Sequence, residues 1–221
     1  MKLRMLGFTL TFVACLAFGL VQSHADVALT GPFAGTISEG FESFPTPAFY
    51  ISYLNNPTSI MDGNAVITHP QIYIYEPGVI NFGLASSGIA QVSDGVKGVG
   101  VNAFGTTVDV SWSSPISQFG GYFAAATSIG FPDPIPVTVS FFAQSGSLVG
   151  AETFTYSHSA TGDGGLDWHG WVFDEPVSSV SLSGSFFVMD GMQAVVVPES
   201  TSLGLAILGF SFTVVRLFRL R

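Results

Sequence analysis

Residues 108–113 read VDVSWS, and residues 137–141 read VTVSF. In both stretches an apolar residue alternates with a polar one, the period of two that turns one row of a β-strand inward and the other outward. No window of helical length before the carboxyl-terminal tail shows an apolar period of 3.6 residues. The two stretches therefore predict that the central part of the chain is all-β.

Further strand candidates lie on both sides of these two. Gly, Pro, Asn and Asp separate them, as is typical of turns between short strands. Residues 144–147, QSGS, predict a hairpin turn, whereas residues 26–40 and 55–70 are expected to be irregular. Many short strands at this spacing predict an antiparallel sandwich or barrel. The additional candidates are residues 71–76, 79–85, 97–104, 117–125, 148–157, 169–173, 177–182 and 186–196.

The charges are distributed unevenly along the 221 residues. Residues 26–197 hold one basic residue, Lys97, against 14 acids. Affinity for nucleic acid comes from basic side chains that neutralise phosphates and release counterions. This composition excludes nucleic acid as a partner, and the length fits one domain flanked by short end segments.

Residues 1–25 are predicted to be a secretory signal peptide. Two basic residues precede an apolar run over residues 5–21, and Ser23 and Ala25 give the small-x-small pattern of cleavage before Asp26. Two alternatives stay open: an uncleaved anchor, or a lipoprotein cleaved just before Cys15. After cleavage at Ala25 no cysteine remains, so the fold would depend on core packing without disulfides.

The carboxyl-terminal end has three parts in a fixed order. A polar motif precedes an apolar run over residues 203–215, and arginines close the chain. The run alone covers about 20 Å, and flanking apolar positions up to Leu220 bring it to the length of a transmembrane helix with a cytoplasmic basic tail. A terminal amphipathic or buried helix, and a plain anchor that is never cut, stay open as alternatives. The motif is Val197-Pro198-Glu199 and the basic tail holds Arg216, Arg219 and Arg221.

This end resembles the PEP-CTERM sorting signal of Gram-negative bacteria, which consists of Val-Pro-Glu-Pro, a hydrophobic helix and a short basic tail. Ser200 departs from the pattern, because it stands where the family has its second proline. The resemblance covers about 25 residues and rests on the order of motif, helix and arginines behind a signal peptide. It implies that the chain is a substrate of an exosortase, which sorts it from the membrane to the cell surface or extracellular matrix.

A second resemblance concerns the domain over residues 26–196. Phe41-Glu42 and residues 188–192 are similar to the first and last strands of lectin-like jelly rolls, which implies an antiparallel two-sheet jelly-roll sandwich. In calcium-bearing members, acids from those two strands meet at a structural calcium ion. The resemblance thus implies that Glu42 and Asp190 contribute to a calcium site, completed by backbone carbonyls. Two solvated surface acids are the alternative.

An aromatic pair supplies the candidate ligand site. Sugars are commonly bound by aromatic faces with polar groups nearby, and Trp168 and Trp171 follow an Asp- and Gly-rich segment. On a strand the two indoles point to opposite faces, so at most one lines a given surface and the other belongs to the core. Packing is the alternative for both, because aromatic residues are abundant in this chain.

No catalytic constellation is present in the sequence. It lacks Gly-x-Ser-x-Gly, His-Glu-x-x-His and a phosphate-binding glycine loop, and no spacing singles out a pair of carboxylates. The sequence therefore predicts a non-enzymatic, exported surface or matrix protein that binds polysaccharide or calcium. An extracellular glycan hydrolase and a membrane-anchored structural coat protein are the alternatives.

Overall fold

The computed structural model describes residues 26–45, 53–81, 90–125, 136–155 and 165–198. The predicted signal peptide, the apolar run over residues 203–215, Glu199 and the three terminal arginines lie outside these ranges. Within the described ranges, no helix is long and apolar enough to cross a membrane.

Eleven strands and one short helical turn make up the described structure. Every strand pair is antiparallel, which confirms the predicted all-β, antiparallel class. The elements are β1 (Val27–Leu29), β2 (Ile37–Glu39), β3 (Thr58–Ile60), η1 (Met61–Gly63), β4 (Ala65–Thr68), β5 (Ile72–Tyr75), β6 (Gly98–Val101), β7 (Thr106–Ala125), β8 (Pro136–Phe142), β9 (Leu148–Thr155), β10 (Asp167–Gly184) and β11 (Phe187–Val196).

The two longest strands, β7 and β10, pair with each other over almost their whole length. Their register is interrupted between Val172 and Ser179. Pro115 and Pro176 lie at this interruption, and proline cannot donate to a strand ladder because it has no amide hydrogen. Each long strand can therefore change direction there and pair with one set of neighbouring strands before the interruption and another set after it.

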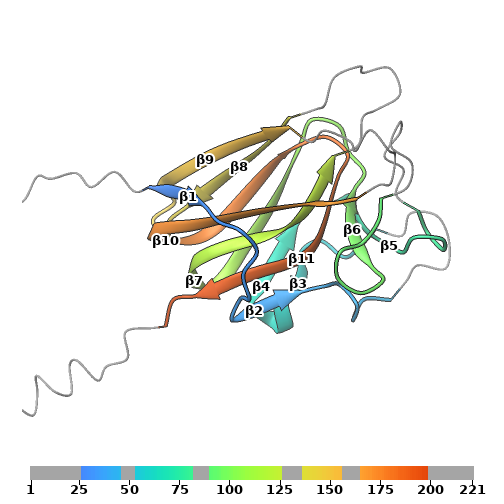
Figure 1. The fold of residues 1–221 in the computed structure, drawn as a ribbon, viewed down its shortest axis with the longest axis horizontal. Helices are drawn as coiled ribbons and strands as arrows, with labels where there is room; N and C mark the ends of the chain where they lie inside the picture. The colour runs from blue at the N-terminus through green and yellow to red at the C-terminus, as the bar shows by residue number, and fades with distance from the viewer. Residues whose placement is uncertain (1–25, 46–52, 82–89, 126–135, 156–164, 199–221) are drawn as a thin grey trace, which may run out of the picture.

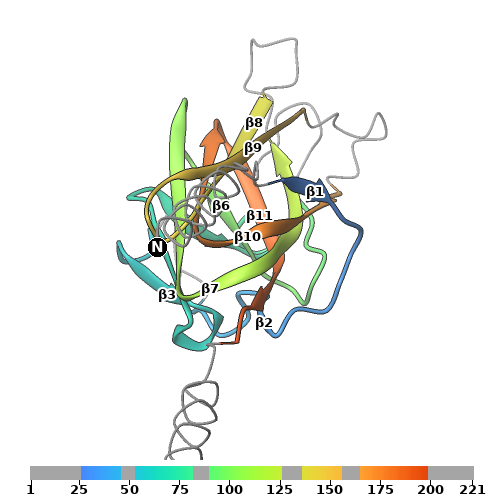
Figure 2. The same cartoon turned by 90° about the vertical axis from the view of Figure 1, so that its left-hand side faces the viewer.

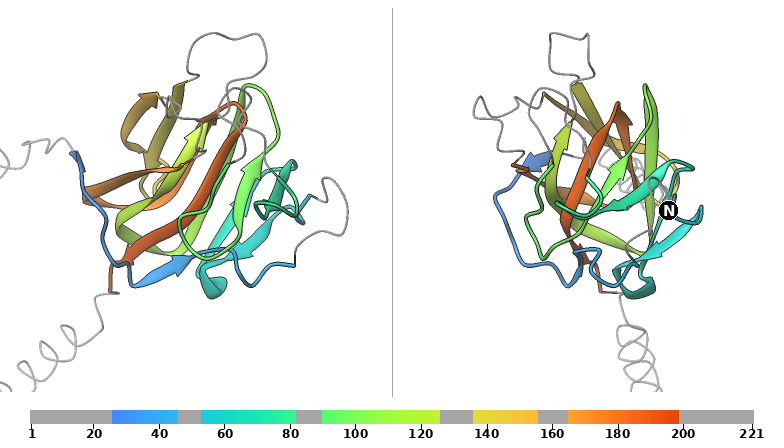
Figure 3. Two further views of the ribbon diagram at one scale, coloured as in Figure 1. Left: turned by 45° about the vertical axis from the view of Figure 1, so that its right-hand side comes forward. Right: turned by 90° about the vertical axis from the view of Figure 1, so that its right-hand side faces the viewer.

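On one side of the interruption the strand order is β3, β4, β7, β10, β8, β9. On the other side β1 pairs with β10, and β11 lies between β7 and β6 (Figure 3). β5 pairs with β6, and β2 pairs with β11. An end-on view shows these strands arranged around a common interior (Figure 2). All of them belong to one hydrogen-bonded network, and the two-sheet jelly roll stays a prediction.

One hydrophobic core joins both sets of strands. Val110 and Val180 come from one set, and Phe119 and Trp171 come from the other. The indole of Trp171 stacks on Phe119 with ring centroids 6.0 Å apart and packs against Phe141 at 5.3 Å. The alternation in residues 108–113 works as predicted, because its apolar row is buried and Asp109, Ser111 and Ser113 are exposed.

The structure corrects two predictions about the strands. Residues 26–40 and 55–70, expected to be irregular, contain β1 to β4. Each of these short strands is defined by the strand with which it pairs. Segments 169–173 and 177–182 are parts of the single strand β10. The hairpin turn at residues 144–147 is confirmed, with Gly146 at a φ of 82° and its amide bonded to the Ala143 carbonyl at 2.9 Å.

Both ends of the described domain leave at the same end of the fold (Figure 1). Val27 pairs with Phe173 in β10, and Val196 pairs with Ile116 in β7. The order β1, β10, β7, β11 separates the two exits by three strand spacings, roughly 15 Å. Asp26, the first residue after the predicted signal peptide, is also where the described structure begins.

Candidate functional site

Trp168 and Trp171 lie on opposite faces of β10, as the strand period requires. Trp171 has no exposed surface and belongs to the core. This corrects the assignment of Trp171 to a ligand site, because a fully buried indole has no ring face to offer. Trp168 is half-buried on the outer face, so one member of the predicted pair stays a candidate.

A pair of glycines creates the space in which Trp168 lies. Gly170 in β10 is directly opposite Gly120 in β7. A Cβ atom built on Gly120 would lie 2.6 Å from Cζ2 of Trp168, and one built on Gly170 would lie 2.7 Å from its Nε1. The indole therefore lies across two glycines and fills space that side chains would occupy at any other pair of residues.

Two aromatic rings and a hydrogen bond fix this indole. Phe33 and Tyr122 meet it edge-on, with ring centroids 5.5 Å and 5.2 Å away. Its Nε1 donates to the backbone oxygen of Thr30 at 3.2 Å. We call Trp168, Phe33 and Tyr122, with the glycines beneath them, the Trp168 platform. It is a rigid aromatic surface on the outside of the sheet.

The acids Glu42 and Asp190 both bind one loop, residues 93–97. Asp190 accepts hydrogen bonds through Oδ2 from the amides of Ser93 and Asp94, and through Oδ1 from its neighbour Gly191. Oε1 of Glu42 accepts from the amides of residues 96 and 97 at 2.7 and 2.9 Å. The two predicted ligands are thus brought to the same loop from distant parts of the sequence.

Asp190 is fully buried under this loop. Burial raises the pKa of its carboxyl group to about 6, against the opposing effect of the three amide hydrogen bonds, and the nearby charge of Asp94 adds to the rise. An ionised carboxylate at this position is therefore a costly group whose charge is stabilised by the loop amides.

These contacts assign both carboxylates a structural part, since five amide donors point at their oxygens. A cation bound to these oxygens would lie next to the positive ends of the same amide dipoles, which oppose its binding. Among the described residues, no group of three or more His, Cys, Asp or Glu side chains is placed to hold a metal ion. Calcium binding by Glu42 and Asp190 stays a prediction from the sequence.

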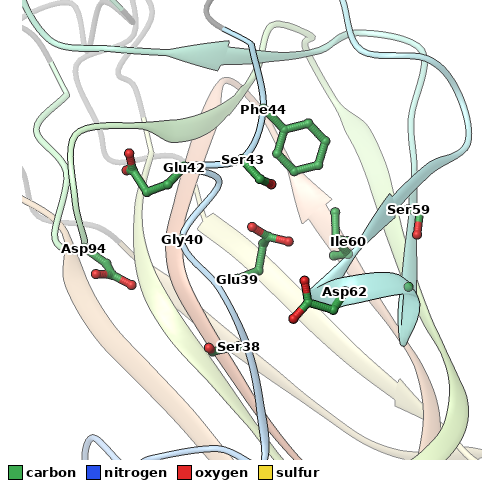
Figure 4. A pocket seen from close by; sticks show the side chains of 11 residues that line it. Ser38, Glu39, Gly40, Glu42, Ser43, Phe44, Ser59, Ile60, Asp62 and Asp94 are labelled. Carbon is green, nitrogen blue, oxygen red and sulfur yellow. The ribbon is translucent and has the colours of Figure 1, made fainter.

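A pocket of about 350 Å³ lies next to this loop. Figure 4 shows Glu39 and Asp62 on facing segments, with Glu42 and Asp94 on the other side of Gly40. The walls also carry hydroxyl groups and one aromatic ring. We call this the acidic pocket, and its lining residues are Ser38, Glu39, Gly40, Glu42, Ser43, Phe44, Ser59, Ile60, Asp62, Gly63 and Asp94.

Backbone strain is concentrated beside the pocket. Phe41, Met61 and Asp62 have φ values of 60°, 52° and 54°, in the left-handed region that side chains disfavour. The Glu39 carboxylate stabilises two of these residues through hydrogen bonds. Its Oε1 accepts from the Phe41 amide and its Oε2 accepts from the Met61 amide, each at 2.7 Å. The carboxylate thereby joins β2 to η1 and sets the shape of the pocket wall.

Two histidines within the described ranges have structural contacts. The His69 ring bonds to the Thr106 hydroxyl at 2.6 Å and to the Gln71 amide at 3.0 Å. His169 stacks on Phe154 with centroids 4.0 Å apart. Burial lowers the pKa of both rings.

The predicted sorting motif begins at the residue after the last strand. β11 ends at Val196, the Val197 amide donates to the Pro115 carbonyl at 2.8 Å, and Pro198 is exposed. Glu199 and the basic tail lie outside the described residues. The motif thus starts where the sheet ends.

Sequence reasoning found Trp168 but missed the residues that make it a platform. Phe33 and Tyr122 carry no local signal, because their neighbours come from distant segments. Glycine inside a strand does mark a close approach, so Gly120 and Gly170 were the one readable sign.

No protein-family model matches the chain, and no curated protein matches it. Among solved structures it is similar to a DUF4465 family protein from Bacteroides caccae, with 12% identity and a TM-score of 0.42 over 78% of this chain and 100% of the other. It is also similar to CsCBM6-3 from Clostridium stercorarium, solved in complex with cellobiose: 11% identity, TM-score 0.34, 68% of this chain and 100% of the other. The CBM22-1 xylan-binding domain from Paenibacillus barcinonensis shows 14% identity and a TM-score of 0.35 over 76% of this chain and 99% of the other. All three scores lie below 0.5, so neither the family nor the ligand of this chain follows from them.

Proposed function

We propose that this chain is an exported, exosortase-sorted surface or matrix protein whose β-domain binds polysaccharide through the Trp168 platform without catalysing a reaction. The observation that carries the binding proposal is the indole of Trp168 held across Gly120 and Gly170. Pyranose rings present apolar C–H faces, and a rigid aromatic ring binds such a face at little cost in conformational entropy.

The sorting part of the proposal rests on the order of segments. The first strand begins at Val27, the second residue after the predicted signal peptide, and the last strand ends directly before Val197. The motif, the apolar run and the arginines follow in the sequence. A sorting signal in this position can be recognised and cut without unfolding the sheet.

The two-sheet jelly roll is part of the same proposal. Its support is the interruption in β7 and β10, which gives each strand one set of neighbours before it and another after it. Both sets contribute to one core. Two sheets packed face to face over a shared core would have this arrangement.

The binding proposal is tested with the full chain, purified in mild detergent, against soluble neutral, amino-bearing and acidic polysaccharides in affinity gel electrophoresis. Retardation by at least one polymer is expected, and Trp168→Ala should abolish it. Phe104→Ala is the matched control, because Phe104 is an aromatic residue with 62% exposure that lies outside the platform. Equal binding by wild type and Trp168→Ala would contradict the proposal.

The same mixtures separate the alternatives. A glycan hydrolase would release reducing ends from a polymer during incubation, whereas a binding protein leaves the polymer intact. A purely structural coat protein would bind none of the polymers.

A further inference from the structure

Gly191 lies between the Trp168 platform and the acidic pocket. Tyr122, one edge of the platform, is directly opposite Asp190 in the strand register. A Cβ atom built on the neighbouring Gly191 would lie 3.1 Å from Cδ2 of Tyr122 and 3.4 Å from Cβ of Asp94. The tyrosine ring and the Asp94 side chain therefore both lie beside Gly191.

Asp94 in turn leads to the pocket. A Cβ atom built on Gly40 would lie 2.8 Å from Oδ2 of Asp94, and both residues line the acidic pocket together with Glu42 and Asp62. The surface thus crosses β10, β7, β11 and the end of β2, roughly 15 Å at ordinary strand spacing. This length suits an oligosaccharide rather than a single sugar.

The charge along this surface has one sign. Lys97 is the one basic residue between positions 26 and 197, and its ammonium group donates to the carbonyl oxygens of Glu42 and Phe44 at 3.2 and 2.7 Å. The Lys97 ammonium group is thereby bonded to the backbone of residues 42–44 beside the pocket. The carboxylates of Asp94 and Asp62 face the pocket with no basic side chain beside them among its lining residues.

We propose that platform and pocket form one binding surface for a polysaccharide of amino sugars, whose rings stack on Trp168 and whose protonated amines bind the pocket carboxylates. This inference rests on the proposed polysaccharide binding. Charge complementarity selects the occupant, because an acidic polymer would be repelled by this surface, whereas a neutral one would offer the carboxylates only uncharged hydroxyl donors. Ammonium groups donate charge-assisted hydrogen bonds to carboxylates, which are stronger than neutral ones.

The test compares three β-1,4-linked oligomers of equal length, made of glucosamine, N-acetylglucosamine or glucose, by isothermal titration calorimetry on the full chain in mild detergent. The glucosamine oligomer is expected to bind about tenfold more tightly than the other two. Raising the ionic strength from about 0.05 M to about 0.5 M should remove most of that advantage, because exposed charges are screened.

Two variants locate the effect. Asp94→Asn and Asp62→Asn should lower the ratio of glucosamine to glucose affinity toward one, because Asn still accepts hydrogen bonds from hydroxyl groups but carries no charge to attract an ammonium group. These two acids are chosen because Glu39, Glu42 and Asp190 hold backbone amides, and because Asn also tolerates the left-handed backbone at Asp62. Glu152→Gln on β9 removes the same charge in the other set of strands and should change nothing, with unchanged circular dichroism for all three variants.

The outcomes are distinct. Equal affinity for the three oligomers, lost in Trp168→Ala, would overturn the amino-sugar inference and leave polysaccharide binding intact. A glucosamine preference that survives both Asn variants would overturn the assignment to the pocket. Absence of binding to any oligomer and to the wider polysaccharide panel would overturn both proposals.

Discussion

At the scale of single residues, Gly120 decides whether Trp168 can take its place. Gly120→Ala adds a methyl group 2.6 Å from the indole and 3.0 Å from the His169 carbonyl oxygen, so the ring must move. We expect polysaccharide binding to weaken about tenfold and stability to fall by about 1–3 kcal/mol, the usual cost of overpacking. Tryptophan fluorescence and affinity electrophoresis measure both effects.

The matched control is Gly31→Ala. Nothing lies within 4 Å of a Cβ atom at Gly31, so this variant should bind and unfold like the wild type. If Gly120→Ala bound as well as Gly31→Ala, the glycine pair would not be what positions the indole.

Asp190 gives the fold a pH dependence with a definite sign. Its pKa is raised from 3.8 to about 6 in the folded state, so the folded protein holds this proton more tightly than the unfolded chain. The stability due to this group is therefore full below about pH 4, falls as the pH rises to about 6, and is constant above. A shift of about two pKa units corresponds to about 3 kcal/mol.

Urea unfolding of wild type and Asp190→Asn at pH 4 and pH 7 measures this dependence. The wild type should lose about 3 kcal/mol relative to the variant between the two pH values, because the other carboxyl groups cancel in the difference. A nuclear magnetic resonance titration of the Asp190 side chain with its midpoint at or below pH 4 would contradict the prediction.

The same titration of Asp190, repeated with calcium, tests whether calcium binds at this site. A divalent cation in contact with a carboxylate favours the charged form and lowers its pKa. Calcium binding at Glu42 and Asp190 therefore requires the Asp190 midpoint to fall when calcium is added. An unchanged midpoint would contradict calcium binding at this pair of carboxylates.

Single residues also show how far the sequence alone can reach. The opposite orientation of Trp168 and Trp171 follows from the strand period, and the structure confirms it. The placement of both Tyr122 and Asp94 beside Gly191 does not follow, because it depends on which distant strands pair. Local alternation tells which face a residue is on, but not what lies beside it.

At the scale of elements, Glu39 joins β2 to η1. Glu39→Ala would leave the buried amides of Phe41 and Met61 without their acceptor, and each such loss costs about 1–3 kcal/mol. We expect the free energy of unfolding to fall by about 2–4 kcal/mol in urea titrations. Relaxation of the two left-handed residues should also change the pocket.

Ser38→Ala is the control for this element, because Ser38 is the exposed neighbour on the opposite face of β2. Its effect should stay within about 0.5 kcal/mol. Equal stability of the two variants would show that η1 is held by other contacts.

The elements themselves were predicted unevenly from the sequence. β8, β9 and β11 lie close to their predicted ranges, because seven or more residues are enough to show alternation or a sustained apolar run. The strands β1 to β4 were missed, whereas β5 and β6, also of four residues, lie inside the predicted ranges 71–76 and 97–104. The continuity of β7 and β10 was missed as well, because prolines inside a strand interrupt the signal that would join its halves.

At the scale of the whole molecule, the last strand ends directly before the predicted sorting motif. Removal of residues 199–221 keeps the Val197 amide that bonds to Pro115, so the melting temperature of the domain should be unchanged. In cells, the truncated protein should move from the envelope to the medium, measured by fractionation and immunoblotting.

A change in the motif separates sorting from a plain anchor. Glu199→Ala leaves the apolar run and the arginines intact, so an exosortase substrate should accumulate uncut in the membrane. Processing and localisation like those of the wild type would contradict the sorting proposal.

The shared exit end of β1 and β11 has a mechanical consequence. For a domain tethered through Val197, a pull on the tether runs along β11, which is bonded to β7 on one side and to β6 and β2 on the other. Ladder hydrogen bonds are perpendicular to the strands, so such a pull loads many of them in shear at once instead of peeling them one by one. A polymer held on the outer face of β10 and β7 would thus transmit tension to the cell surface through the most heavily bonded part of the sheet.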